Sequence, residues 1–251
     1  MSLFTRKPIK FSAAVIGDNG ITATVDAPPD SRIVSLTKTA AVSIRKNGID
    51  GQKAAVYLVL DHSGSMQNFY RNGSVQHLAE QALGLSANLD DDGTVPVVFF
   101  QSYAHPAMDL RIGQHEGGID RLRATNDVRF GSTDYADGMR AVLAHRAAEV
   151  PHNMPCLVLF QTDGHPDSTS EVEGILRDAS HLPIFWQFIG FGNDEFRFLR
   201  KLDTLRGRLV DNAGFWDAGP HPKNIPDADL YDAILSEFPV WLDAAKMAGV
   251  L

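Results

Sequence analysis

Continuous apolar runs alternate with amphipathic segments from residue 54 onward. The runs lack the polar alternation of a half-exposed strand, so each predicts a strand that is buried on both faces. They are VYLVL (56–60), VPVVFFQ (95–101), CLVLFQ (156–161) and PIFWQFIGFG (183–192). The segment between the first two carries Val75, Leu78, Ala79, Ala82 and Ser86 at helical spacing.

Weaker signals complete this pattern. HPAMDLRI (105–112) predicts an edge strand, and GRLVDNAGFW predicts a final strand. Further helices are expected in GSTDYADGMRAVLAHRAAEV, TSEVEGILRDASH and DEFRFLRKLDTL. A last helical stretch, DADLYDAILSEFPVWLDAAKM, should be split or kinked at Pro239. The fold class is therefore α/β: a doubly wound, mostly parallel central sheet with helices on both faces.

Residues 1–50 differ from the rest of the chain in composition. ITATVDAPPDSRIVSLTKTAAVSIRKNGIDG mixes β-branched residues with Pro-Pro and Gly breaks. This composition favours an extended N-terminal arm or hairpin followed by a linker. We therefore expect one α/β domain over residues 51–251, preceded by that arm.

Composition excludes several functional classes. The chain has 251 residues and a net charge of -8, and it lacks the basic face that nucleic-acid binding requires. The N-terminus has a basic start, but its apolar stretch is short and ends at Asp18, so we interpret it as a non-functional segment that only looks like a signal peptide. No apolar run is long enough to span a membrane. The single cysteine, Cys156, permits no intramolecular disulfide. These features favour a cytoplasmic protein without membrane insertion.

Oxygen-bearing side chains gather where the predicted strands end. Asp61, Ser63 and Ser65 follow the first strand, Asp163 follows the strand at 156–161, and Thr133 precedes a helix. Ligands of doubly wound sheets bind beyond the carboxyl ends of the strands, so these loops can converge on one spot. Two carboxylates and three hydroxyls suit a hard cation, Mg²⁺ first, then Mn²⁺ or Ca²⁺. The alternative is that these residues are turn and helix-cap residues.

DHSGSM, with the threonine of GSTDYADGM and the aspartate of QTDG, resembles the metal-ion-dependent adhesion site of von Willebrand factor A (vWA) domains. The resemblance covers roughly residues 54–248. It implies that Ser63, Ser65 and Thr133 are direct ligands and that Asp61 and Asp163 lie close by, often coordinating through water. It further implies a non-catalytic module whose ion binds an Asp or Glu carboxylate of a protein partner.

The flanking segments resemble a narrower group. VSLTKTAAVSI, FLRKLDTLRGRLVDNAGFW and LYDAILSEFPVWL are similar to vWA-type bacterial tellurium-resistance proteins. That resemblance implies an intracellular role in tellurite or toxic-ion stress, with other tellurium-resistance proteins as candidate partners.

Three residues flank the expected site. His62 and His165 are expected on its exposed rim, where they could contact a partner. Asp134 could also lie on this rim, where it would repel an acidic partner, or it could complement the dipole of the helix that follows.

Two other functions remain open from the sequence. One is a Mg²⁺-dependent hydrolase or phosphoryl-transfer enzyme that uses the strand-end Asp and Ser residues. Against it, the chain has no phosphate-binding loop of the G-x-x-x-x-G-K-[ST] type and no G-x-S-x-G motif. The other is direct binding of the toxic oxyanion through the metal, for which one open coordination position offers little selectivity.

Overall fold

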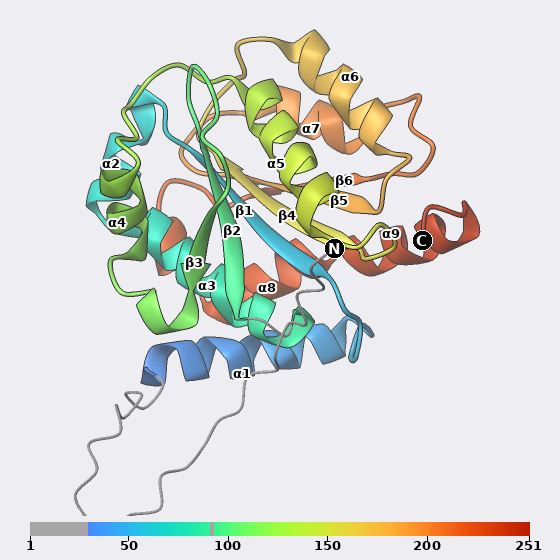
Figure 1. The fold of residues 1–251 in the computed structure, drawn as a ribbon, viewed down its shortest axis with the longest axis horizontal. Coiled ribbons are helices and arrows are strands. Elements are labelled where there is room, and N and C mark those ends of the chain that lie inside the picture. Colours follow the sequence, from blue (N-terminus) through green and yellow to red (C-terminus); the bar gives the residue numbers. More distant parts are fainter. Residues whose placement is uncertain (1–29, 91–92) are drawn as a thin grey trace, which may run out of the picture.

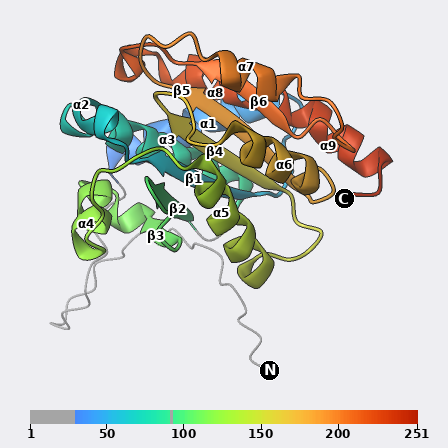
Figure 2. The same cartoon turned by 90° about the horizontal axis from the view of Figure 1, so that it is seen from above.

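The computed structural model describes residues 30–90 and 93–251. These residues contain a six-stranded sheet with the order β3-β2-β1-β4-β5-β6, which can be followed from strand to strand in Figure 2. All neighbouring strands are parallel except the edge strand β3, which is antiparallel to β2. The strands are β1 (Ala55–Asp61), β2 (Thr94–Phe100), β3 (Met108–Arg111), β4 (Cys156–Thr162), β5 (Ile184–Gly190) and β6 (Ala213–Asp217).

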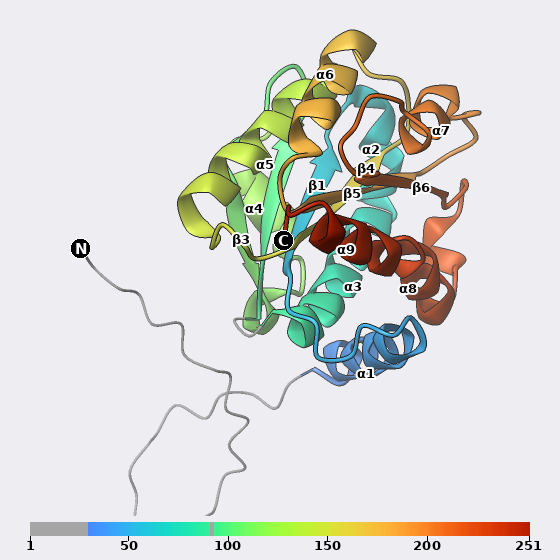
Figure 3. The same ribbon diagram turned by 90° about the vertical axis from the view of Figure 1, so that its right-hand side faces the viewer.

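Helices cover both faces of the sheet, which confirms the predicted fold class (Figures 1 and 3). One face carries α3 (Ser74–Leu89), α8 (Asp227–Leu235) and α9 (Phe238–Met247), with α2 (Gln67–Arg71) and α4 (Gly118–Thr125) beside them. The other face carries α5 (Tyr135–Glu149), α6 (Thr169–Ala179) and α7 (Arg197–Asp203). Short 3₁₀ turns lie at Gly64–Met66, Ile112–Gln114 and Pro222–Asn224.

Alternate residues of each central strand enter opposite cores. In β1, Leu58 and Leu60 belong to the core beneath α3 and α8, whereas Tyr57 and Val59 belong to the core beneath α5 and α6. Successive side chains of a strand point to opposite faces, so a strand covered on both sides must be apolar at every position. This explains the continuous apolar runs of the sequence.

The expectation of an extended arm is wrong for residues 31–46, which form the helix α1 (Ser31–Lys46). Its buried residues Ile33, Leu36, Ala40 and Ile44 recur with a helical period and pack against α3 and α8, so α1 adds an outer layer on that face (Figure 3). Packing outweighs the weak preference of β-branched residues for strands. Residues 1–29 lie outside the described part of the chain.

The predicted break near Pro239 is confirmed. α8 ends at Leu235 and α9 begins at Phe238, so Pro239 occupies the first turn of α9, where its missing N–H costs no intrahelical hydrogen bond. Across the described residues, none of the helices combines the length and apolar character needed to cross a membrane.

Candidate metal centre

The expected site lies at the point where the sheet changes winding direction. From β1 the chain moves outward to β2 and β3, and then returns to build β4 on the other side of β1. β1 and β4 are parallel, with Leu60 opposite Gln161, so Asp61 and Asp163 leave the sheet at the same edge. Such switch points leave a crevice beyond the strand ends, which is the usual ligand site of doubly wound folds.

Four of the five predicted ligands form one hydrogen-bonded cluster. The Ser63 and Ser65 hydroxyl oxygens are 3.1 Å apart, and the Ser65 hydroxyl donates to Asp163 Oδ1 at 2.8 Å. The backbone N–H of Ser63 donates to Asp61 Oδ1 at 2.7 Å. Ser63 is buried while Ser65 is exposed, so the cluster opens to solvent on one side only.

Asp61 is a fully buried carboxylate. Its Oδ2 accepts a hydrogen bond of 2.6 Å from the Thr162 hydroxyl. Burial raises the pKa of Asp61 to about 6, against the lowering effect of hydrogen bonds from Thr162 and Ser63, and the charge of Asp163 adds to the rise. Burial also raises the pKa of Asp163, and the neighbouring charge of Asp194 acts in the same direction.

Thr133 lies on the adjoining loop, which is held against the β1 loop through its backbone. Gly131 N–H donates to the His62 carbonyl at 3.2 Å, and Gly64 N–H donates to the Gly131 carbonyl at 3.1 Å. A Cβ at Gly131 would lie 2.2 Å from Gln101 Oε1 and 3.1 Å from Gln101 Cβ, so the absence of a side chain at Gly131 eases this approach. The structure thus places the Thr133 loop beside the cluster, while the hydrogen bonds that Thr133 makes within the described residues come from its backbone.

The expectation that His62 lies on an exposed rim is wrong. The side chain is 0 % exposed, and its ring stacks on Phe130 with centroids 4.0 Å apart. Its Nε2 accepts a hydrogen bond of 2.7 Å from Arg123 Nε, and burial lowers its pKa to about 4. The loop after β1 turns this side chain inward because Tyr70, from the helix that follows the loop, and the distant Phe130 and Arg123 surround it.

The other two flanking residues differ in role. His165 is exposed beside Asp163 and keeps its rim position, with its ring near Phe198. Asp134 is the N-cap of α5, because its side chain accepts a hydrogen bond from Asp137 N–H at 3.0 Å. This bond favours the helix-capping account of Asp134.

Sequence reasoning missed several groups that support the site. The Tyr135 hydroxyl lies 2.8 Å from the Thr162 hydroxyl, and Tyr70 donates to the Asp61 carbonyl at 2.9 Å. Asp167 Oδ2 accepts a hydrogen bond of 3.2 Å from Thr133 N–H. Thr162 had the clearest signal in the sequence, because it directly precedes the candidate ligand Asp163.

The donor set fits a hard divalent cation. All the groups are oxygens, and two carboxylates balance two positive charges while the hydroxyls add coordination without charge. The charges that raise the pKa values of Asp61 and Asp163 are those of other carboxylates. A cation held at Ser63, Ser65 and Asp163 would relieve this repulsion.

Fold and site together define a vWA-type domain. A family model described as "vWA found in TerF C terminus" matches residues 53–251. The chain therefore belongs to the vWA-TerF-like family.

One relative by sequence and two solved structures are similar to this chain. The uncharacterized protein YcbR of Bacillus subtilis is 36% identical over 216 residues, which span 85% of this chain and 88% of that protein. The manganese-loaded TRAP protein of Plasmodium vivax is 21% identical with a TM-score of 0.52, over 75% of this chain and 74% of that one. The vWA domain of SpRpn10 is 12% identical with a TM-score of 0.53, over 71% of this chain and 93% of that one. At these identities the two structures share the fold.

Proposed function

We propose that the chain is a non-catalytic protein-binding module that acts through a divalent cation. Ser63, Ser65 and Thr133 would hold the ion directly, with Asp61 and Asp163 beside it. An open coordination position would then accept an Asp or Glu carboxylate from a protein partner. Mg²⁺ is the proposed ion, with Mn²⁺ or Ca²⁺ as substitutes.

One observation carries this proposal: Ser63, Ser65 and Asp163 converge at the switch point beside the buried Asp61. Ser65 is exposed while Asp61 is buried, so an ion here would have protein ligands on its inner side and solvent on its outer side. The manganese-loaded structure of the Plasmodium vivax TRAP protein supports a divalent ion in this fold.

The surroundings of the two serines support a non-catalytic role. His62, the nearest histidine in sequence, is buried and bonded to Arg123, so it does not face a serine as a general base. His165 Nδ1 lies 3.0 Å from the carbonyl of its neighbour Pro166. This arrangement favours binding over the rival hydrolase function.

The cellular setting rests on the family. The TerF-like family suggests a role in bacterial tellurite or toxic-ion stress. We further propose a cytoplasmic location and other tellurium-resistance proteins as candidate partners. The single carboxylate contact gives modest affinity, so the loops around the ion would supply the specificity.

Metal binding is tested by calorimetric titration of metal-free protein with Mg²⁺, Mn²⁺ and Ca²⁺. We expect one saturable site, weakened at least about tenfold in Ser65→Ala and in Asp163→Ala. Ser170→Ala, on the exposed surface of α6, is the matched control and should bind as the parent does. Equal affinity in all four proteins would contradict the assigned ligands.

Carboxylate recognition is tested on the metal-loaded protein. Partners captured from a bacterial lysate with Mg²⁺ present should be released by chelator and by Ser65→Ala. In the identified partner, replacement of the contacting Asp or Glu by its amide should abolish binding. If the protein still retained the partner after chelation, the ion would not take part in recognition.

A further inference from the structure

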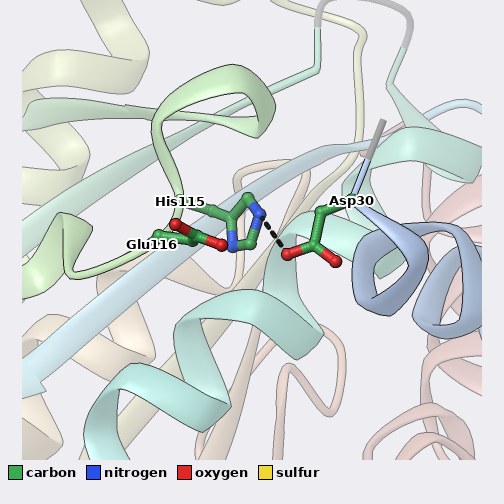
Figure 4. A group of neighbouring side chains, drawn as sticks. All are labelled: Asp30, His115 and Glu116. Atoms are coloured by element: carbon green, nitrogen blue, oxygen red, sulfur yellow. Dashed lines mark ion pairs between the residues drawn. The ribbon is translucent and has the colours of Figure 1, made fainter. Parts of the chain in front are cut away.

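A second cluster of ionisable side chains lies far in sequence from the first. Asp30, His115 and Glu116 each present a ligand atom, and these atoms all lie within 4.8 Å of one another. Asp30 directly precedes α1, and the other two residues lie in the loop before α4. Figure 4 shows the His115 ring between the two carboxylates.

His115 is the buried member of this cluster. The residue is 5% exposed, and its Nε2 lies 3.3 Å from Asp30 Oδ2. Its Nδ1 has no hydrogen-bond partner among the described residues. A buried imidazole with carboxylates on both sides is costly unless a proton or a cation lies at Nε2, and Nδ1 needs an acceptor of its own.

The neighbouring residues arrange the cluster as a metal site requires. Asp30 Oδ1 accepts a hydrogen bond of 2.8 Å from Arg32 N–H as the cap of α1, which leaves Oδ2 to face His115. On the other side of the ring, Nδ1 lies 3.7 Å from Glu80 Oε1. A histidine that binds metal through one nitrogen generally donates the other N–H to a carboxylate, and Glu80 is the carboxylate on the Nδ1 side of the ring, just beyond hydrogen-bond distance.

The loop that carries the histidine is fixed by Gln76 of α3. Gln76 Nε2 donates to the His115 carbonyl at 2.7 Å, and its Oε1 accepts from Ile119 N–H at 3.1 Å. Glu116 is exposed at the mouth of the cluster, so an ion could enter from solvent.

The local charge favours a divalent cation. Arg32 is paired with Glu80, and Arg121 donates to the carbonyls of Gln114 and Glu116, so neither cation neutralises Asp30 or the Glu116 carboxylate by a direct contact. Two carboxylates and a neutral imidazole then match a charge of +2.

We propose that Asp30, His115 and Glu116 bind a borderline divalent cation such as Zn²⁺, with Glu80 orienting the histidine. A nitrogen ligand selects Zn²⁺ over Mg²⁺ and Ca²⁺, in contrast to the all-oxygen site at the strand ends. The ion clamps the start of α1 to the loop before α4.

The test is calorimetric titration of the full chain with Zn²⁺ in the Ser65→Ala/Asp163→Ala background, which disables the strand-end site. We expect one Zn²⁺ per chain, little response to Mg²⁺, and a Zn²⁺-dependent rise in Tm. Asp30→Asn should weaken binding at least about tenfold while preserving the helix cap, because Asn caps as well as Asp. Glu116→Gln, an exposed change, should also weaken it.

His181→Ala, which removes an exposed histidine outside the cluster, is the control and should bind Zn²⁺ as the background does. His115→Ala should abolish binding, and the variants at the half-buried Asp30 and the exposed Glu116 keep the test decisive if that protein does not fold. Absence of Zn²⁺ binding would overturn the proposal and leave an ion pair between His115 and Asp30. Binding that survives Asp30→Asn and Glu116→Gln would place the ion elsewhere and also overturn it.

Discussion

The packing of α1 on the domain depends on a glycine in the middle of α3. At Gly84 a Cβ atom would lie 2.8 Å from Leu36 Cβ, 3.0 Å from the Leu36 carbonyl carbon and 2.8 Å from the Tyr231 hydroxyl. Tyr231 cannot turn away freely, because its hydroxyl donates to the Gln81 carbonyl at 2.9 Å. Gly84→Ala must therefore move α1 or α8.

Two opposing effects set the size of this change. Alanine is favoured over glycine inside a helix by about 1 kcal/mol, so an unobstructed substitution would stabilise the protein. Overpacking a close-packed core costs about 1–3 kcal/mol. Because one of the contacts is with backbone, we expect the clash to cost about 2–3 kcal/mol, the upper part of this range, so Gly84→Ala should lower the free energy of unfolding by about 1–2 kcal/mol.

Gly174 in α6 provides the matched control. Nothing lies within 4 Å of its Cβ position, so Gly174→Ala should raise the free energy of unfolding by about 0.5–1 kcal/mol. Urea unfolding followed by circular dichroism would measure both variants, with equal m-values as the check on two-state behaviour. Equal stabilisation by both substitutions would refute the packing of α1 against Gly84.

Two further predictions concern the site loop and a carboxylate away from it. Gly131→Ala should displace the Thr133 loop, because the added Cβ would clash with Gln101, and should weaken Mg²⁺ binding in calorimetry about tenfold or more. Gly164→Ala, which has open space at its Cβ position, should leave Mg²⁺ binding unchanged. Burial, with the charge of Asp203, raises the pKa of Glu237 from 4.5 to about 7, so the folded state holds the proton more tightly and its stability falls as pH rises between these values. Glu237→Gln should then raise the free energy of unfolding by about 1 kcal/mol at pH 8, after allowance for solvent screening, and give no such gain at pH 4. Urea unfolding at the two pH values measures this, and the same gain at both would contradict the raised pKa of Glu237.

Local patterns predicted the sheet well because each strand is buried on both faces. The run at 56–60 can be read directly as a central strand, and the apolar spacing of Leu78 and Ala82 marks the face of α3 that enters the core. Pro239 marks the break between the last two helices for a purely local steric reason. Signals of this kind do not depend on distant residues.

The misread elements depend on contacts between distant residues. α1 is helical because Leu36 and Ala40 pack on α3 and α8. The sequence of residues 31–46 does not show that these two helices lie against it. The position of His62 in DHSGSM predicts that it lies on an exposed rim. In the structure its ring stacks on Phe130 and accepts a hydrogen bond from Arg123, and the side chain is buried. The motif fixes the positions of the oxygen donors and says little about the side chains between them.

The strand-end cluster also differs from the rest of the core, because it buries a carboxylate and a hydroxyl in place of apolar side chains. Asp61 is a buried carboxylate held by neutral donors, and its nearest charged influence is the carboxylate of Asp163. A core residue at the same position would strengthen the sheet, whereas an ionised Asp61 weakens it in the metal-free state. Groups whose pKa values are shifted by burial and by a like charge concentrate at functional sites. A buried pair of carboxylates destabilises the free protein, and the same pair attracts a cation. The cost of burying Asp61 is thus itself an argument that a cation belongs there.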